Sequence, residues 1–537
     1  MINRLTPVIF FLLGAVAIAN VQEAYAQTLI YVDPANSQSS DYNPGTQTLP
    51  VRTLKKAAAL VVEYNRNWTS TKVLVAPGTY RENLEIVYDS RPTSASITYE
   101  STTKGAAIVA GSDVWTGWAW ESGSIYRKSW PYRWGSAGNP TNWQNLASLP
   151  TLLRRREMIF INGVALRAVD SYGALAAGTF FVSESWGLVY IWAPSGTNMS
   201  TAKIEVAVRE HPLQVRGRQN VTIRGFVFQH ANTIAEEAAG EISDASSVLL
   251  EDNQFIWNAW CGLGVLAANY VTLRRNIASN NGVVGMQSWK LKNFLAEDNQ
   301  TSYNNWRGAQ NGFYGWAAAG MKNAQVHSGV FRRQKVIGNY SGGFWLDTDC
   351  KNITLESSFL NDNRGWGLFL EANQGPIRVE NNAICRNKTT HGIFVANTKN
   401  VTLNANTIYG NGGSLGNMSG QLGISGEYNG SRQIQDWETG QTLDLMSENW
   451  TMTNNTIVGL NSKQMDIFTT VSPYVWNTFA YSLSSSYNLW YSYSTKYSYL
   501  MPNYIFIDFP NWQRQTGKDS NSWYVSPEQA GVPIYCD

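Results

Sequence analysis

The feature that most constrains the fold of this chain is a short repeat that ends in asparagine. Runs of aliphatic and β-branched residues lead to Asn253, Asn276 and Asn299, which follow one another at intervals of 23 residues. The pattern returns at Asn382 and Asn406, which are 24 residues apart. A fixed period of this length indicates a solenoid, in which each repeat packs only against its neighbours.

The residues within each repeat decide which solenoid is expected. Short apolar cores at 353–355 (ITL), 377–379 (IRV) and 401–403 (VTL) keep the same period and show no helical pattern of 3.6 residues. A leucine-rich repeat needs regular leucines and a helical segment in each repeat, and these repeats are β-branched and rich in asparagine instead. The sequence therefore predicts an all-β fold, a right-handed parallel β-helix, with asparagine side chains stacked at its turns.

Departures from this period divide the chain. A helix expected at 53–64 would cap the open end of the coils, because terminal repeats need a cover. Alternating apolar and polar residues at 158–163 and 188–192 indicate antiparallel hairpins inserted before the main coils. The predicted segments are a signal peptide (1–26), an N-terminal cap with the first coils (27–110), an inserted antiparallel β-domain (111–203), the parallel β-helix catalytic domain (204–470) and a C-terminal extension packing on the helix (471–537).

The N-terminus has the pattern of an export signal. Arg4 precedes an apolar run at 7–19, and a small-x-small cleavage motif follows at 24–26. We therefore expect a secreted or periplasmic protein, and no later segment has the pattern of a membrane span. Export permits a disulfide among the four cysteines, and their spacing leaves the pairing open. The composition fits a carbohydrate partner, because 22 tryptophans offer flat rings to sugars, whereas a net charge of +2 argues against nucleic acid.

Three consecutive repeats place two carboxylates in one column. The segments 343–347 (GFWLD), 367–371 (GLFLE) and 392–396 (GIFVA) align at one-coil intervals. Side chains alternate along a strand, so the aliphatic residues point inward, and Asp347 and Glu371 share the outer face on adjacent strands. Neighbouring strands lie about 4.8 Å apart, which places the two carboxyl groups on the order of 5 Å apart. Three aromatic residues are expected to form a stacking wall for a sugar on the same face: Trp345, Phe369 and Phe394.

A pair of carboxyl groups at this separation is typical of a retaining glycosidase, in which one is the nucleophile and the other the acid/base. Two such close groups do not both ionise easily, so one keeps a raised pKa and acts as an acid near neutral pH. A stacked acidic pair also arises by chance on the surface of a β-helix, and the aromatic column is what favours a functional role.

These segments resemble the site of a known family. The segments 343–347 and 367–376 (GLFLEANQGP) are similar to the site of the β-helix β-xylosidases of glycoside hydrolase family 120. In that family the nucleophilic Asp lies in a G-x-W-L-D segment, and the acid/base Glu lies in L-F-x-E-x-N-x-G-P one coil later. The segment 319–322 (AGMK) resembles its A-G-I-K strand, and an inserted β-domain precedes its coils. The resemblance implies Asp347 as the nucleophile and Glu371 as the general acid/base.

Other residues are candidates for roles around this pair. Lys322 lies one coil before Trp345 and is expected to bind a sugar hydroxyl or to lower the pKa of Asp347. Asn373 is expected to orient the sugar or the acid, and Arg307 to clamp the substrate from a loop. The pattern leaves open whether Asp349 is a second acid or a turn cap, and whether Glu427 binds substrate. No metal or cofactor is predicted, because neither the four histidines nor the cysteines have metal-ligand spacing.

Three functions are compatible with the sequence. The first is a glycosidase acting on a plant or algal glycan. The second is a polysaccharide lyase or epimerase acting on a polyuronate, with Lys322 as the base, although the outer face has no basic cluster. The third is a non-catalytic carbohydrate-binding adhesin, which would keep the aromatic wall without needing both acids. The sequence leaves open the sugar, the linkage, exo or endo action and the oligomeric state.

Overall fold

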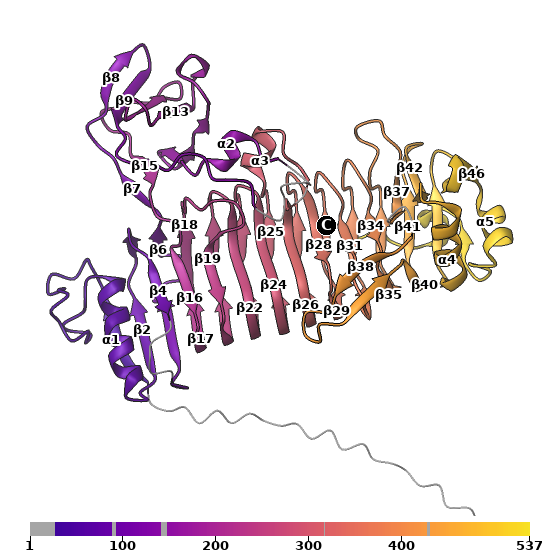
Figure 1. The fold of residues 1–537 in the computed structure, drawn as a ribbon, viewed down its shortest axis with the longest axis horizontal. Coiled ribbons are helices and arrows are strands. Elements are labelled where there is room, and N and C mark those ends of the chain that lie inside the picture. The colour runs from indigo at the N-terminus through magenta and orange to yellow at the C-terminus, as the bar shows by residue number, and fades with distance from the viewer. Residues whose placement is uncertain (1–26, 88–92, 141–147, 316, 427–429, 537) are drawn as a thin grey trace, which may run out of the picture.

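In the computed structural model, residues 27–87, 93–140, 148–315, 317–426 and 430–536 are described. The predicted signal peptide and Glu427 lie outside these residues. The described chain winds into a long column of stacked coils, with the inserted domain at one end and short helices at the other (Figure 1). Parallel strands from successive coils pair into three ladders that run along the column.

The first ladder carries the candidate site. Its strands are β4 (Leu84–Val87), β16 (Leu213–Arg216), β19 (Ala238–Ser243), β22 (Cys261–Arg274), β24 (Val284–Glu297), β26 (Ala319–Arg332), β28 (Gly342–Asp347), β31 (Leu368–Glu371), β34 (Ile393–Ala396), β37 (Ser419–Ser425), β42 (Gln464–Thr469) and β45 (Tyr499–Met501).

The second ladder shares the long strands β22, β24 and β26 with the first. Its other strands are β1 (Thr28–Val32), β2 (Thr71–Val75), β5 (Ile97–Ser101), β17 (Gln219–Arg224), β20 (Ser246–Glu251), β29 (Lys351–Glu356), β32 (Ile377–Glu380), β35 (Lys399–Asn404), β40 (Glu448–Thr453) and β43 (Ser484–Ser486).

The third ladder closes each coil. Its strands are β3 (Gly78–Tyr80), β6 (Ala107–Ala110), β18 (Phe226–Gln229), β21 (Gln254–Ile256), β23 (Ile277–Ser279), β25 (Gln300–Ser302), β27 (Lys335–Ile337), β30 (Phe359–Asn361), β33 (Ala383–Cys385), β36 (Thr407–Tyr409), β41 (Thr456–Gly459), β44 (Leu489–Ser492) and β47 (Trp523–Tyr524). The expected all-β architecture of parallel coils is confirmed.

The interior of the column is a stack of aliphatic and aromatic side chains in register. Phe344, Leu368, Ile393 and Leu422 pair in sequence from one strand of the first ladder to the next, and all four are fully buried. No single coil encloses such a residue, so each coil is stabilised by the apolar surface that its neighbours cover.

Buried asparagines at the turns hold the coils in register. The Asn276 amide nitrogen donates to Asn299 Oδ1 at 3.2 Å and to the Leu250 carbonyl at 2.8 Å. A second series at another turn follows the same rule from coil to coil: Asn258, Asn281, Asn304, Asn339, Asn363, Asn387 and Asn411. Each of these side chains satisfies backbone groups that would otherwise be buried without a partner.

Helices cover the two ends of the column. Helix α1 (Leu54–Arg66) begins at the N-cap Thr53, whose side chain accepts from Lys56 N, and it packs Leu54 and Leu60 into the main core. At the other end lie α4 (Pro473–Ser482), α5 (Phe509–Thr516) and α6 (Pro527–Ala530). The tail does more than pack across the coils, because β43, β44, β45 and β47 extend the ladders.

Cys385 and Cys536 form a disulfide that joins the C-terminal segment to the third ladder, while Cys261 and Cys350 are free and buried. The described part of the chain has no helix that is long and apolar enough to cross a membrane.

The inserted domain separates the early coils from the main coils in the sequence, but these coils pair directly with one another and the domain projects from their side (Figure 1). Antiparallel pairing joins most of its strands, which are β7 (Ser112–Val114), β8 (Ala119–Ser122), β9 (Ile125–Ser129), β10 (Ile159–Ile161), β11 (Val164–Ala165), β12 (Arg167–Ala168), β13 (Thr179–Ser183), β14 (Leu188–Trp192) and β15 (Ile204–Ala207). It also contains α2 (Thr151–Arg154) and the 3₁₀ turn η2 (Tyr172–Ala174).

Two further insertions rise from the coils themselves. A loop between β25 and β26 carries the short helix α3 (Trp306–Gln310). A segment between β37 and β40 forms the antiparallel hairpin β38 (Arg432–Gln435) and β39 (Thr442–Leu445), which lies outside the three ladders.

We expect Asn363→Ala to lower the free energy of unfolding by about 3 kcal/mol, because it leaves buried groups without partners. Asn363 Oδ1 accepts from Asn339 N and Nδ2, and its own Nδ2 donates to Val336 O. Urea unfolding followed by circular dichroism measures the change. Asn477→Ala, at an exposed position of α4, is the matched control. Equal effects of the two substitutions would contradict the proposed role of the asparagine series.

Candidate active site

Asp347 and Glu371 lie at the ends of neighbouring strands. Asp347 is the last residue of β28 and Glu371 is the last residue of β31. The two strands pair in parallel with Trp345 opposite Phe369 and Leu346 opposite Leu370, so the same register brings Asp347 beside Glu371. The predicted juxtaposition of the two carboxylates is therefore present.

Asp347 has its own cation. Lys322, from the preceding strand β26, places its Nζ 2.9 Å from Asp347 Oδ2. The Thr348 hydroxyl donates to Asp347 Oδ1 at 2.9 Å. Burial alone would raise the pKa of Asp347, but the Lys322 ammonium and the Thr348 hydrogen bond outweigh it and hold the pKa below its ordinary value. Asp347 is thus arranged to stay ionised.

Glu371 is held from two sides. Trp345 Nε1 donates to Glu371 Oε2 at 3.1 Å, and Arg432 of β38 donates to Glu371 Oε1 at 2.5 Å. Burial raises the pKa of Glu371 most, and the neighbouring charge of Asp347 raises it further. Arg432 and Lys322 act in the opposite direction, and the balance leaves the pKa above its ordinary value. Two carboxyl groups with pKa values pushed apart are the arrangement that acid/base catalysis needs.

Two of the three residues of the expected stacking wall are covered, whereas Phe394 is partly buried and stacks on Phe369 with ring centroids 4.7 Å apart. Trp345 is 3% exposed and Phe369 is 7% exposed. Trp366, from the turn before β31, packs edge-on against Trp345 with ring centroids 5.5 Å apart and lies 5.1 Å from Phe369. The Lys322 ammonium lies 3.9 Å from the centre of the Trp345 ring. The buried rings pack against the side chains that form the ion pairs of Asp347 and Glu371. Trp345 and Phe369 therefore leave little surface for a sugar.

Two other predicted binding residues are inside the protein. Asn373 is fully buried, where its side chain accepts from Cys350 N and donates to Leu346 O. Arg307 is 4% exposed and donates to the carbonyls of Ala259 and of Arg155 in the inserted domain. Neither side chain is therefore placed to touch a substrate directly, because each is buried and bonded to backbone groups.

Asp349 is also fully buried, so its carboxyl group is not placed to act on a substrate as a second acid. Its carboxylate accepts from Trp437 N at 2.9 Å and from Gln374 Nε2 at 2.6 Å, and His327 Nε2 lies 3.4 Å away. His327, Asp349 and Asp436 approach one another as metal ligands would. Lys351 and Gln374 already bond to Asp436, however, so hydrogen bonds within the protein satisfy this group.

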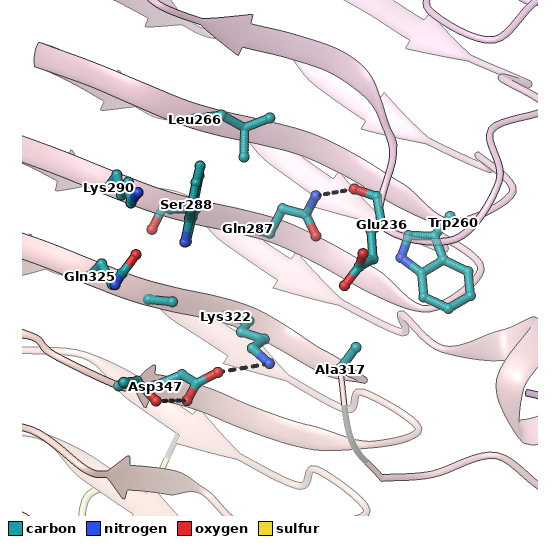
Figure 2. A pocket seen from close by; sticks show the side chains of 13 residues that line it. Glu236, Trp260, Leu266, Gln287, Ser288, Lys290, Ala317, Lys322, Gln325 and Asp347 are labelled. Atoms are coloured by element: carbon teal, nitrogen blue, oxygen red, sulfur yellow. Dashed lines mark hydrogen bonds and ion pairs between the residues drawn. The ribbon is translucent and has the colours of Figure 1, made fainter. Parts of the chain in front are cut away.

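A cavity of about 590 Å³ opens beside Asp347. Figure 2 shows Lys322 and Asp347 bonded at one end and Glu236 with Trp260 at the other, and Gln287 from β24 lies between them. The Gln287 amide donates to the Glu236 carbonyl at 2.8 Å. Both polar and apolar groups line this space, as is usual for a site that binds a small molecule.

Three lining residues, Gln287, Trp289 and Glu236, were not predicted from the sequence, and neither was Arg432, which bonds to Glu371. Gln287 pairs with Lys322, and Trp289 pairs with Ala324, across an interval of 35 residues. The insertion that carries α3 lengthens this coil and hides the period. Alignment of residues 284–297 with 319–332 across this insertion would have placed Gln287 and Trp289 one coil before Lys322 and Ala324.

Comparisons with known proteins support the architecture. A family model described as a right handed beta helix region matches residues 213–408 and 313–480. No curated protein sequence matches the chain. The structure of XylC in complex with xylose is similar over 93% of this chain and 87% of its own, with a TM-score of 0.65 and 14% identity.

Two further solved structures are similar at lower scores. A glycoside hydrolase covers 87% of this chain and 96% of its own at a TM-score of 0.48 and 10% identity. The A-module of the mannuronan C-5 epimerase AlgE4 from Azotobacter vinelandii covers 88% and 95% at a TM-score of 0.46 and 11% identity. The family model, the XylC structure and the parallel ladders of the chain itself show that the fold is a right-handed parallel β-helix.

We expect Lys322→Met to destabilise the protein by about 2 kcal/mol near pH 7, since it leaves Asp347 buried without its cation. The penalty should shrink as the pH falls toward about 4, because the unpaired carboxyl then takes up a proton and no charge is buried. Urea unfolding at a series of pH values measures this dependence.

The double variant Lys322→Met/Asp347→Asn provides the control for this prediction. It should recover most of the loss at pH 7, because the buried charge is gone. A penalty that is independent of pH and persists in the double variant would show that Lys322 acts through packing alone.

Proposed function

We propose that this protein is a glycoside hydrolase that cleaves its substrate with retention of anomeric configuration. The observation that carries the proposal is the pair Asp347 and Glu371, which lie on adjacent strands with pKa values shifted in opposite directions. Adjacent strands are about 4.8 Å apart, which fits the separation of about 5–5.5 Å between carboxyl groups in retaining enzymes. Inverting enzymes need a wider gap for a water molecule.

In the first step, an Asp347 oxygen forms a bond to the anomeric carbon as the glycosidic bond breaks. Glu371 gives its proton to the leaving oxygen, so the alcohol departs neutral and Glu371 becomes a carboxylate. In the second step, Glu371 takes a proton from water while the water oxygen attacks the anomeric carbon, and Asp347 leaves as a carboxylate. The ionised state of Asp347 and the raised pKa of Glu371 suit these two roles.

The cavity beside Asp347 is the proposed sugar site. Lys322 and Gln287 offer N–H donors, and the Glu236 carboxylate offers acceptors, to sugar hydroxyls along its length. XylC, whose solved structure contains xylose, has the same fold. Pentosides are for that reason the first substrates to test, together with plant and algal polysaccharides. We also propose that the protein is exported, on the pattern of residues 1–26.

We predict that Glu371→Ala and Asp347→Ala fail in different ways. Without Glu371, hydrolysis of substrates with poor leaving groups should fall by about 10²–10⁴-fold, because only those substrates need protonation. Activated aryl glycosides should still react, and azide should restore turnover by replacing the activated water. Without Asp347, both kinds of substrate should be inert, since no covalent intermediate forms.

Steady-state kinetics on matched aryl glycosides measures these effects, and NMR of the first product reports the anomeric configuration. Glu380→Ala is the control, because Glu380 lies on β32 of the same coil but in the second ladder. An inverted first product would refute the nucleophile assignment. A product that absorbs in the ultraviolet as an unsaturated uronate would instead identify a lyase.

A further inference from the structure

The hairpin β38–β39 brings a cation to Glu371 from outside the coils. Arg432 is the first residue of β38, and its Nη1 donates to Glu371 Oε1. Trp345 Nε1 donates to the other oxygen, Oε2. Each oxygen of Glu371 therefore accepts one N–H, which fixes the plane of the carboxyl group between the hairpin and the coils.

Strand β38 contacts the coil that carries Glu371 along its length. Alternation along the strand turns Arg432, Ile434 and Asp436 toward the coils, whereas Gln433 and Gln435 are exposed. Ile434 packs with Leu445 of β39 against Ala372, which directly follows Glu371, and Asp436 bonds to Gln374. The three inward side chains thus contact three positions in the run 371–374.

The turn of the hairpin is fastened to the second ladder. We call this set of contacts the latch, defined by Asp436, Trp437 and Glu438. Asp436 Oδ2 accepts from Lys351 Nζ at 2.8 Å, and Glu438 pairs with Lys292 and His327. Burial alone would raise the pKa of Asp436, but Lys351, Gln374 and backbone N–H groups hold it well below its usual range. The latch is therefore charged at neutral pH and strongly hydrogen-bonded.

The other end of the hairpin is held as well. The Asn397 amide donates to the carbonyls of Gly430 and Leu445 at 3.0 Å each. Because both ends are fixed and Ile434 is buried between them, the backbone at Arg432 has little freedom to move away from Glu371. The Arg432 guanidinium is therefore held at one position beside Glu371, as is expected of a group that supports an active site.

We propose that Arg432 is a positioning residue for Glu371, and that the latched hairpin exists to hold its guanidinium against that carboxyl group. The inference rests on the proposed function, in which Glu371 gives up and regains a proton in each cycle. Arg432 stabilises the carboxylate that forms when the proton leaves. It also keeps the carboxyl group aimed at the leaving oxygen.

Three charged groups face Glu371 in addition to its burial: Asp347 from β28, Lys322 from β26 and Arg432 from β38. Burial and Asp347 favour the protonated form, and the two cations favour the carboxylate. Removal of Arg432 takes away one of the two positive charges that favour the Glu371 carboxylate. Glu371 should therefore keep its proton up to a higher pH. The acid would then be weaker and less well oriented.

The first test needs no substrate. Carbodiimide with glycine ethyl ester labels protonated carboxyl groups, and peptide mass spectrometry follows the labelling of Glu371 as the pH is raised. In Arg432→Gln the midpoint at which labelling stops should lie about one pH unit higher than in the wild-type protein. Arg432→Lys, which keeps the charge, should stay near the wild-type midpoint. Gln433→Ala, on the opposite face of the strand, is the matched control.

The second test separates orientation from charge. On a poor leaving group, kcat should fall about tenfold in both Arg432→Gln and Arg432→Lys, with little change on an activated glycoside. The basic limb of the pH profile should move upward only in Arg432→Gln. Asp436→Asn, which weakens the latch without touching Arg432, should shift the labelling midpoint in the same direction by a smaller amount.

The outcomes separate the two proposals. Glycosidase activity with an unchanged Glu371 midpoint in folded Arg432→Gln, checked by circular dichroism, would overturn the positioning role and leave the proposed function standing. A shifted midpoint in a protein that cleaves no glycoside would support the influence of Arg432 on Glu371 and refute the proposed function. An unchanged midpoint in Asp436→Asn together with a shift in Arg432→Gln would refute the role of the latch.

Discussion

Parallel pairing in a fixed register, from one coil to the next, is the constraint on which the rest of the structure depends. In this register Phe344 is opposite Leu368 and Leu346 is opposite Leu370, and these side chains point inward. Because side chains alternate along a strand, Asp347 and Glu371 must then lie side by side on the outer face. The buried asparagines at the turns enforce this register, because each amide bonds to the same position in the next coil. The core and the site are therefore consequences of one repeated interaction.

The two carboxylates receive their cations from different sources. Lys322 reaches Asp347 from the same ladder, so the repeat itself supplies it. Arg432 reaches Glu371 from an inserted hairpin that pairs with none of the ladders. The pKa of one carboxyl group is lowered and that of its neighbour is raised. In the proposed mechanism this difference lets Asp347 attack and Glu371 donate a proton. An insertion outside the repeat can thus tune a site that the repeat creates.

The parts of the site that follow the repeat were predictable from the sequence, and the parts that depend on insertions were not. The adjacency of Asp347 and Glu371 and the place of Lys322 follow from a one-coil offset and from alternation. The burial of Trp345 and Phe369 depends on Trp366, a residue in a turn whose direction the period does not fix. Arg307 lies on the inserted helix α3 and Asn373 in the turn after β31, where their side chains bond to backbone groups that the sequence pattern does not reveal.

The most direct test of the central claim is to trap the covalent intermediate. The aryl glycoside that the protein hydrolyses fastest, prepared as its 2-deoxy-2-fluoro analogue, should inactivate the enzyme and add one glycosyl group. Mass spectrometry of the digested protein should then find that group on Asp347, because its carboxylate forms the bond to the anomeric carbon. A label on another residue, or turnover of the parent glycoside without any label, would contradict the assignment of Asp347 and Glu371 as a nucleophile and acid/base pair.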